Sequence, residues 1–346
     1  MTARILLPGL LGLGAGVLVL AGLQVAAPIL VPITFAFFTI ALVLPLQRAL
    51  ESHITRPLAM LVTIIVTLAV VSLLGGMVVW GLTRVGAWLV TNSANITALY
   101  AQAAVMLEAR GFDAAVMLAQ QFDIAWLLRL VRSAAAQVQG LFTFIALMMV
   151  FVILGMMEVD MTARKLETLG GKGQGRAVLH IAQRVAWKLQ RYMVVRTVMS
   201  VATGLAVFAF AYLFGLELAL EWGVIAFALN YIPFIGPLVA TALPALLAMV
   251  QFGTVGAALT VLVSLNVIQN IIGSYLEPRI AGAALAVSPF IVLLSVFFWA
   301  FLWGIAGAFI GIPIVIACLT ACAAYPSTHW VAVLLSGSAD PVQTEG

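Results

Sequence analysis

Most of the chain consists of long apolar stretches separated by short polar ones. Many of these stretches approach or exceed the roughly 20 residues that an α-helix needs to cross the ~30 Å hydrocarbon core of a bilayer. They occupy residues 5–26, 28–46, 58–82, 141–157, 197–215, 218–252, 255–276 and 289–323. This pattern predicts an all-α, polytopic membrane protein with about eight hydrophobic segments. We interpret residues 5–26 as a retained span rather than a cleaved leader, because a second apolar stretch follows directly.

Two of the stretches, 218–252 and 289–323, are too long for one span and contain helix-breaking residues. Proline lacks the backbone donor that a helix needs, and an unpaired backbone group at membrane depth must lie within protein or line a wet cavity. We expect re-entrant hairpins or paired short spans here, with ordinary kinked helices as the alternative. Two broken segments in comparable positions are typical of transporter binding sites. The expected hinge positions are Pro233, Gly236, Pro237, Gly304, Gly307, Gly311 and Pro313.

The span between these broken segments carries a row of polar side chains. Residues spaced three and four apart share one face of a helix. Such side chains either form hydrogen bonds with a neighbouring helix or bind a polar solute. Solute binding would also suit Asn230 and Tyr231, the polar residues at the break within 218–252. The candidate solute-binding residues are Asn230, Tyr231, Asn266, Gln269, Asn270 and Ser274.

Formal charge is almost absent from the last third of the chain. Between Glu221 and Asp340 only Glu277 and Arg279 are charged, and Pro278 separates them. A charge at the centre of a span costs roughly 2.5–3.5 kcal/mol on insertion scales and is usually tied to function. We therefore predict a gate or coupling pair at Glu277 and Arg279, with Pro278 as a further helix break.

The composition excludes several classes of protein. Hydrophobic residues make up 64% of the chain and charged residues 8%, against about 25% charged residues in soluble domains. The net charge of +4 arises from loop residues, so we expect no nucleic-acid partner. The sequence has no phosphate-binding loop and no His-Glu-x-x-His pattern. We therefore expect no enzyme, no cofactor and no metal site, and the expected partners are the lipid bilayer and a small polar solute.

The distribution of basic residues predicts the topology. The intervals 47–57 and 158–196 each carry more basic than acidic residues, and such loops face the cytoplasm. With both termini cytoplasmic, the interval 84–139 is external, and its helical runs 114–118 and 124–131 predict amphipathic helices on the membrane surface or against another subunit. The basic amphipathic segment 178–192 predicts an interfacial helix.

These features predict five regions along the chain. A three-span segment is followed by an external amphipathic region, a fourth span with the basic helix, a transport core with broken helices, and a cytoplasmic tail. Their ranges are 1–82, 83–140, 141–196, 197–324 and 325–346.

Several short motifs, taken in order, resemble those of the autoinducer-2 exporter (AI-2E) family, also called the PerM-like permeases. They are Asn230-Tyr231-Ile232-Pro233 with Gly236, Leu276-Glu277-Pro278-Arg279 with Gly282, Ser288-Pro289, Gly304, Gly307 and Pro313. The resemblance covers nearly the whole chain and implies a secondary-type transporter of the bacterial inner membrane that forms homo-oligomers. One position departs from the pattern, because Ala283 stands where the family commonly has a basic residue.

The resemblance leaves the substrate open, since some members are linked to autoinducer-2 export and others to sodium–proton exchange. A neutral polar row suits a small hydroxyl-rich solute such as autoinducer-2, so export of such a solute is the first hypothesis. A sodium (cation)/proton antiporter is the alternative, although the acids near the later spans, Glu217, Glu221 and Glu277, all lie at predicted span edges. A membrane scaffold without transport activity is the alternative from another class.

Overall fold

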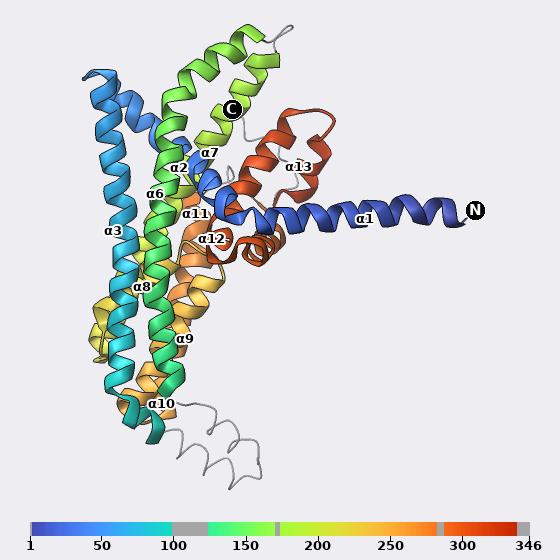
Figure 1. Ribbon diagram of the computed structural model, residues 1–346. Helices are drawn as coiled ribbons and strands as arrows, with labels where there is room; N and C mark the ends of the chain where they lie inside the picture. The colour runs from blue at the N-terminus through green and yellow to red at the C-terminus, as the bar shows by residue number, and fades with distance from the viewer. Residues whose placement is uncertain (1, 99–123, 170–173, 282–286, 338–346) are drawn as a thin grey trace. The chain divides into compact units, whose positions relative to one another are not determined.

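The computed structural model describes residues 2–98, 124–169, 174–281 and 287–337 (Figure 1). Within these ranges the backbone forms helices joined by turns, with one isolated antiparallel bridge between Val287 and Ser336. The fold is therefore all-α, as predicted. The helices are α1 (Thr2–Val25), α2 (Ala27–Glu51), α3 (Arg56–Thr91), α6 (Ile124–Leu169), α7 (Gln174–Phe214), α8 (Ala219–Leu229), α9 (Ile235–Phe252), α10 (Val255–Asn270), the π-helical segment η2 (Ile271–Leu276), α11 (Glu277–Ala281), α12 (Pro289–Ala324) and α13 (His329–Leu335).

In the described part of the chain, seven helices are long and apolar enough to cross a bilayer. The apolar segments Gly12–Val25 and Ala219–Leu229 are shorter. The predicted apolar stretches coincide with helices, apart from the interruption within 218–252, and this confirms a polytopic membrane protein. The seven spans are Ala27–Glu51, Arg56–Thr91, Gly140–Thr168, Gln174–Phe214, Ile235–Phe252, Val255–Leu276 and Pro289–Ala324.

Several helices extend beyond the apolar stretches that predicted them. The predicted amphipathic run 124–131 is the beginning of α6 rather than a separate helix, and the run 114–118 lies outside the described residues. The basic segment 178–192 is continuous with the following span in α7, so it does not form a separate interfacial helix. The reason is local, because no Gly or Pro interrupts the sequence from Arg176 to Thr203.

The chain divides into two compact units, and α3, α6 and α7 each pass from one into the other. The first unit comprises residues 1–67, 144–193 and 281–346, and the second comprises residues 68–143 and 194–280. The five regions drawn along the sequence are a different division, and they remain a prediction.

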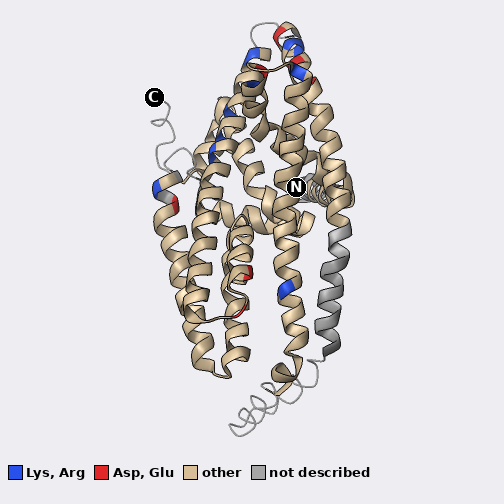
Figure 2. Ribbon diagram, turned by 90° about the vertical axis from the view of Figure 1, so that its left-hand side faces the viewer, with Lys and Arg blue, Asp and Glu red and all other residues tan. Residues whose placement is uncertain are grey.

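Aromatic and small residues hold the first unit together. The ring of Phe35 on α2 packs edge-on against Phe144 on α6 at 5.2 Å and stacks on Phe309 of α12 at 5.7 Å. A Cβ at Gly155 would lie 2.5 Å from Cδ1 of Ile40, so α6 approaches α2 closely at this glycine. Figure 2 shows that charged residues of this unit gather where α6 ends and α7 begins.

The predicted break in the stretch 289–323 is present at Gly304. The helix α12 runs from Pro289 to Ala324, but Gly304 within it has φ 63° and ψ −145°, a conformation that essentially only glycine adopts. Downstream, a Cβ at Gly307 would lie 1.9 Å from the carbonyl oxygen of Trp299. The two glycines therefore allow the chain to turn and then to pack against its own preceding segment.

The second unit is built around a helical hairpin. After α8, residues Asn230–Phe234 leave the helical path, and Phe234 has a φ of 64° before α9 begins. With 11 residues, α8 is about 16 Å long, roughly half of the hydrocarbon thickness. The stretch 218–252 is therefore broken as predicted, and it does not contain two full spans.

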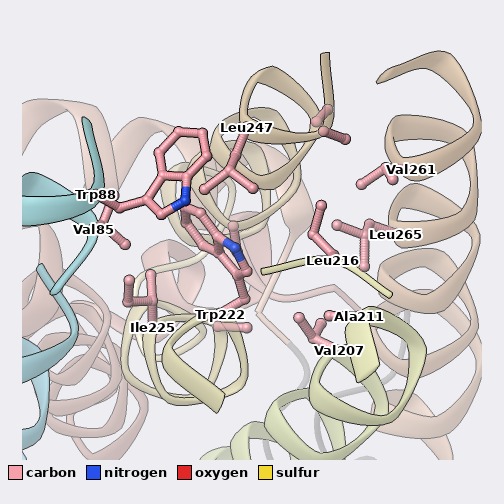
Figure 3. Close-up of a cluster of buried hydrophobic side chains, with 14 residues drawn as sticks. Val85, Trp88, Val207, Ala211, Leu216, Trp222, Ile225, Leu247, Val261 and Leu265 are labelled. Carbon is pink, nitrogen blue, oxygen red and sulfur yellow. The ribbon is translucent and has the colours of Figure 1, made fainter. Parts of the chain in front are cut away.

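A buried apolar cluster lies within the second unit (Figure 3). It includes Trp88 of α3, Trp222 of α8 and Val207 of α7, and Leu265 contributes from α10. The backbones of α7 and α8 approach closely beside it, because a Cβ at Gly204 would lie 2.9 Å from the carbonyl oxygen of Gly223. Small residues at such crossings are typical of membrane helix packing.

Candidate solute-binding site

A buried polar face on α7 organises the second unit. Arg196, Ser200 and Thr203 are each 8% exposed or less, and their spacing of four and three residues places them on one side of the helix. The sequence pattern did not predict this face, because Arg196 lies at the end of the basic interval 158–196. The available signal was the repeat of polar residues that continues from Arg196 into an otherwise apolar span.

The residues of the first break bind this face of α7. Asn230 is buried, and its Nδ2 donates a hydrogen bond to Oγ of Ser200 at 3.3 Å. The hydroxyl of Tyr231 donates to Oγ1 of Thr197 at 3.0 Å. Two predicted site residues are thus brought together with polar residues of α7 that lie about 30 positions earlier in the sequence.

The predicted charged residue Glu277 also lies on this face. Its Oε2 accepts a hydrogen bond from Nη1 of Arg196 at 3.2 Å, and the two side chains are 26% and 10% exposed. Arg279 instead stacks over the ring of Tyr275, 4.0 Å from its centroid. Among the described contacts, the carboxylate of Glu277 is therefore paired with Arg196 and not with Arg279, the other member of the predicted pair.

Pro278 follows a widened turn of the helix. The segment η2 is π-helical, and π-helical turns are common at functional sites and at helix kinks. Proline supplies no N–H to the preceding turn, which gives a local reason for the irregular hydrogen bonding there. The backbone continues through Pro278 in α11, and Gly282 and Ala283 lie outside the described residues.

The structure divides the polar row that was predicted on α10. Gln269 is 9% exposed, whereas Asn266, Asn270 and Ser274 are exposed. Nδ2 of Asn266 donates to the carbonyl oxygen of Leu262 at 2.8 Å, and Nδ2 of Asn270 donates to that of Asn266 at 2.9 Å. Of these four, only Gln269 lies in the interior of the protein.

The polar face of α7 ends at the apolar cluster. One turn after Thr203 comes Val207, and one turn further comes Ala211, both in the cluster that contains Trp88 and Trp222 (Figure 3). The side chains of this cluster are apolar and buried, so water and polar solutes do not readily enter it. The second unit therefore has a polar half and an apolar half.

Beyond the apolar cluster lies a second group of charged residues. Oε1 of Glu221, a residue that is 6% exposed, accepts from Nε of Arg84 at 3.1 Å. The indole N–H of Trp88 donates to the carboxylate of Glu217. Gln251 bridges the turn before α8, donating to the carbonyl oxygen of Gly215 and accepting from the N–H of Glu217, both at 2.8 Å.

The remaining predicted hinge residues lie at close backbone contacts or inside helices. A Cβ at Gly236 would lie 1.9 Å from the carbonyl oxygen of Leu229, so this glycine lets the chain fold back after α8. Pro233 is buried in the break, Pro237 lies in the first turn of α9, and Pro313 lies inside α12. At Gly311 a Cβ would lie 3.1 Å from Oγ of Ser295.

No group of three or more His, Cys, Asp or Glu side chains suited to a metal ion occurs in the part of the chain that the structure describes. The described polar side chains on and against this face of α7 are hydroxyls, amides and the Arg196–Glu277 ion pair. Such groups can form hydrogen bonds with a polar solute.

Comparison with known proteins agrees with a transport role. A family model described as AI-2E family transporter matches residues 13–327. The AI-2 transport protein TqsA of Escherichia coli K12 is 32% identical over 331 residues, which is 94% of each chain. The putative transport protein YhhT of the same organism is 26% identical over 313 residues, covering 89% of this chain and 88% of YhhT. A putative transport protein of Haemophilus influenzae is 25% identical over 351 residues, covering 96% and 97% of the two chains.

Proposed function

Because the chain belongs to the AI-2E transporter family, we propose that it exports a small polar solute such as autoinducer-2 across the bacterial inner membrane. A membrane transporter is what the family and the apolar helices support together. The substrate and the outward direction are our proposal. The observation that carries it is the buried polar face of α7, which collects the hydroxyls and amides of Ser200, Asn230 and Tyr231 within a membrane-spanning unit.

The chemistry of this face suits a solute rich in hydroxyl groups. Such a solute loses its hydrogen bonds to water on entering the protein, and each donor or acceptor left unpaired costs about 1–3 kcal/mol. Hydroxyl and amide groups replace those bonds without adding a net charge. Among the predicted binding residues, Asn230, Tyr231 and Gln269 are the buried ones, so we assign the solute contacts to them.

We assign the role of gate to Glu277 and Arg196, with Arg279 as an outer residue of the same end. The ion pair lies at the polar end of the α7 face, and Pro278 and η2 provide an irregular backbone beside it. The breaks at residues 230–237 and at Gly304 provide further points at which helices can change direction. An ion pair that opens and closes with these movements would control access from one side of the membrane.

The exposed polar residues of α10 have a different proposed role. Asn266, Asn270 and Ser274 are exposed on a membrane-spanning helix, where polar groups are more favourable against another helix than against lipid. The family resemblance implies homo-oligomers. We therefore propose that these three residues contact a second subunit.

The proposed orientation follows the basic residues. The ends of α6 and α7 that carry the charged cluster of Figure 2 would face the cytoplasm, together with Glu277 and both termini. The charged group around Glu221 would then lie at the external end of the second unit. Export begins, in this orientation, at the Arg196–Glu277 pair.

The test is efflux from proteoliposomes loaded with labelled autoinducer-2 precursor, with and without imposed proton and sodium gradients. We expect the wild type to release the label faster than protein-free liposomes. We expect Glu277→Gln to reduce the rate by about tenfold, which corresponds to about 1.4 kcal/mol, because Arg196 loses its described counter-charge. Wild-type release at the protein-free rate would contradict the proposal, and full release by Glu277→Gln would contradict the gate.

One observation favours the cation/proton antiporter as a second candidate. Glu221 is a buried acid on a helix of the second unit and is held by a single described ion pair, to Arg84. Buried acids of this kind carry protons and cations in transporters. Sodium-dependent proton movement in the same liposomes, without movement of the label and abolished by Glu221→Gln, would favour this function over export.

A further inference from the structure

On the neutral side chains of the second unit, two buried polar atoms have no hydrogen-bond partner among the described residues. They are Oγ1 of Thr203, on a residue that is 0% exposed, and Nε2 of Gln269, on a residue that is 9% exposed. Each such group costs free energy when it is left unpaired. A bound solute or an internal water would satisfy both groups.

The packing of α7 against the following helices places these two residues at the same level. One fixed point is the ion pair between Arg196 and Glu277. The other is the apolar cluster, which contains Val207 of α7 and Leu265 of α10. Arg196 precedes Val207 on α7, whereas its partner Glu277 follows Leu265 of α10 in the sequence. The two helices therefore run antiparallel.

Counting residues along α7 and α10 from the ion pair, or from the apolar cluster, places Thr203 and Gln269 at matching positions. Thr203 lies seven residues after Arg196, and Gln269 lies eight residues before Glu277, so each is about two turns from the ion pair. Thr203 lies four residues before Val207, and Gln269 lies four residues after Leu265, so each is one turn from the apolar cluster. The two groups therefore lie at similar heights along α7 and α10, between the ion pair and the apolar cluster.

We propose that Thr203 and Gln269 form the binding layer for a neutral solute that bears hydroxyl or carbonyl oxygens, an inference that rests on the proposed transport function. Nε2 of Gln269 offers N–H donors, and the hydroxyl of Thr203 both donates and accepts. The solute must therefore supply oxygen acceptors. Hydroxyl and carbonyl oxygens of a small carbohydrate-like molecule meet this requirement.

The charges around the layer argue for a neutral solute. On one side of the layer, the nearest described cation along α7 is Arg196, which already pairs with Glu277. On the other side the layer meets the apolar cluster. An anionic solute would lose its hydration there without gaining a free counter-charge, which is strongly unfavourable. The layer therefore selects a neutral solute over its phosphorylated form.

The experiment compares apolar and conservative substitutions in reconstituted protein, with labelled autoinducer-2 precursor as the probe. We expect Thr203→Val and Gln269→Leu each to raise KM for efflux by about tenfold, since one lost hydrogen bond is equivalent to about one power of ten in affinity. Neither change should lower the thermal unfolding midpoint, because each removes an unpaired buried group. Thr203→Ser keeps the hydroxyl and should retain the wild-type KM.

Two matched controls separate binding from general damage. Thr241→Val removes a buried hydroxyl whose donor is already bonded to the carbonyl oxygen of Pro237 at 2.9 Å. Thr260→Val removes an exposed hydroxyl on the same helix as Gln269, one that is bonded to the carbonyl oxygen of Gly256 at 2.9 Å. Both controls should leave KM unchanged, and an increase equal to that of Thr203→Val or Gln269→Leu would overturn the binding layer.

Equilibrium binding of the same probe to detergent-solubilised protein distinguishes this inference from the proposed function. Binding that weakens in Thr203→Val and Gln269→Leu supports the layer even if the wild type shows no efflux, a result that would overturn export alone. Wild-type efflux with unchanged KM in both variants would overturn the layer and leave export standing. Tighter binding of the phosphorylated precursor than of the neutral one would also overturn it.

Discussion

At the scale of single residues, the charge of Arg196 depends on Glu277. The guanidinium is nearly buried, and the carboxylate of Glu277 is its described ion-pair partner at 3.2 Å. Removing one partner of a fully buried pair costs about 3–5 kcal/mol, and the cost here is smaller because Glu277 is 26% exposed. The pair is thus both a structural contact and the proposed gate.

We predict that Arg196→Gln lowers both the efflux rate and the thermal unfolding midpoint, because it leaves the Glu277 carboxylate without its described counter-charge. Arg279→Gln is the matched control, since Arg279 is exposed and rests on the ring of Tyr275. It should retain most of the wild-type efflux and stability. The measurements are proteoliposome efflux and thermal unfolding of the two purified variants. A larger loss of efflux in Arg279→Gln than in Arg196→Gln would assign the gate to Arg279.

At the scale of helices, the contact between α7 and α8 depends on two glycines that face each other. A Cβ at Gly204 would lie 2.8 Å from Cβ of Phe227 and 2.9 Å from the carbonyl oxygen of Gly223. Directly after α8, Asn230 and Tyr231 form hydrogen bonds to Ser200 and Thr197 of α7. A wider spacing between the helices would therefore lengthen these bonds.

We expect Gly204→Ala to destabilise the protein by about 1–3 kcal/mol, the usual cost of overpacking a close contact, and to slow efflux. Gly256→Ala on α10 is the control, because a Cβ there meets nothing within 4 Å. Thermal unfolding in detergent measures the first effect and proteoliposome efflux the second. Equal midpoints for the two variants would show that α7 and α8 separate at little cost.

At the scale of the whole molecule, α3 tests the proposed topology. Its 36 residues correspond to about 54 Å, well beyond the ~30 Å of the hydrocarbon core. The basic loop before α3 and the residues after it must then lie on opposite sides of the bilayer. The proposed orientation rests on the basic residues, because loops rich in them tend to remain in the cytoplasm.

We predict that a cysteine at position 94 reacts with a membrane-impermeant maleimide in intact cells, whereas a cysteine at position 52 reacts only after permeabilisation. The variants are Ala94→Cys and Ser52→Cys, both at exposed positions, in a background that carries Cys318→Ala and Cys322→Ala. These two are the only native cysteines. The reverse labelling pattern would invert the membrane orientation and, with it, the direction in which the Arg196–Glu277 gate faces.

The sequence by itself determined the features that depend on local physics. Apolar stretches predicted the spans, because crossing a bilayer requires a continuous run of apolar residues. Gly and Pro predicted the breaks at residues 230–237 and at Gly304, because each changes the backbone at its own position. The isolated charge at Glu277 predicted the end of a span, and Glu277 does lie directly after η2.

Only the tertiary structure decided which side chains meet. The partners Asn230 and Ser200 are 30 residues apart, and Arg196 and Glu277 are 81 residues apart. Helical spacing alone could not tell that Gln269 is buried while Asn270 is exposed, since neighbouring helices determine which part of a face is covered. The proposed binding layer of Thr203 and Gln269 could not be predicted for the same reason, because its argument depends on tertiary contacts near both ends of two antiparallel helices.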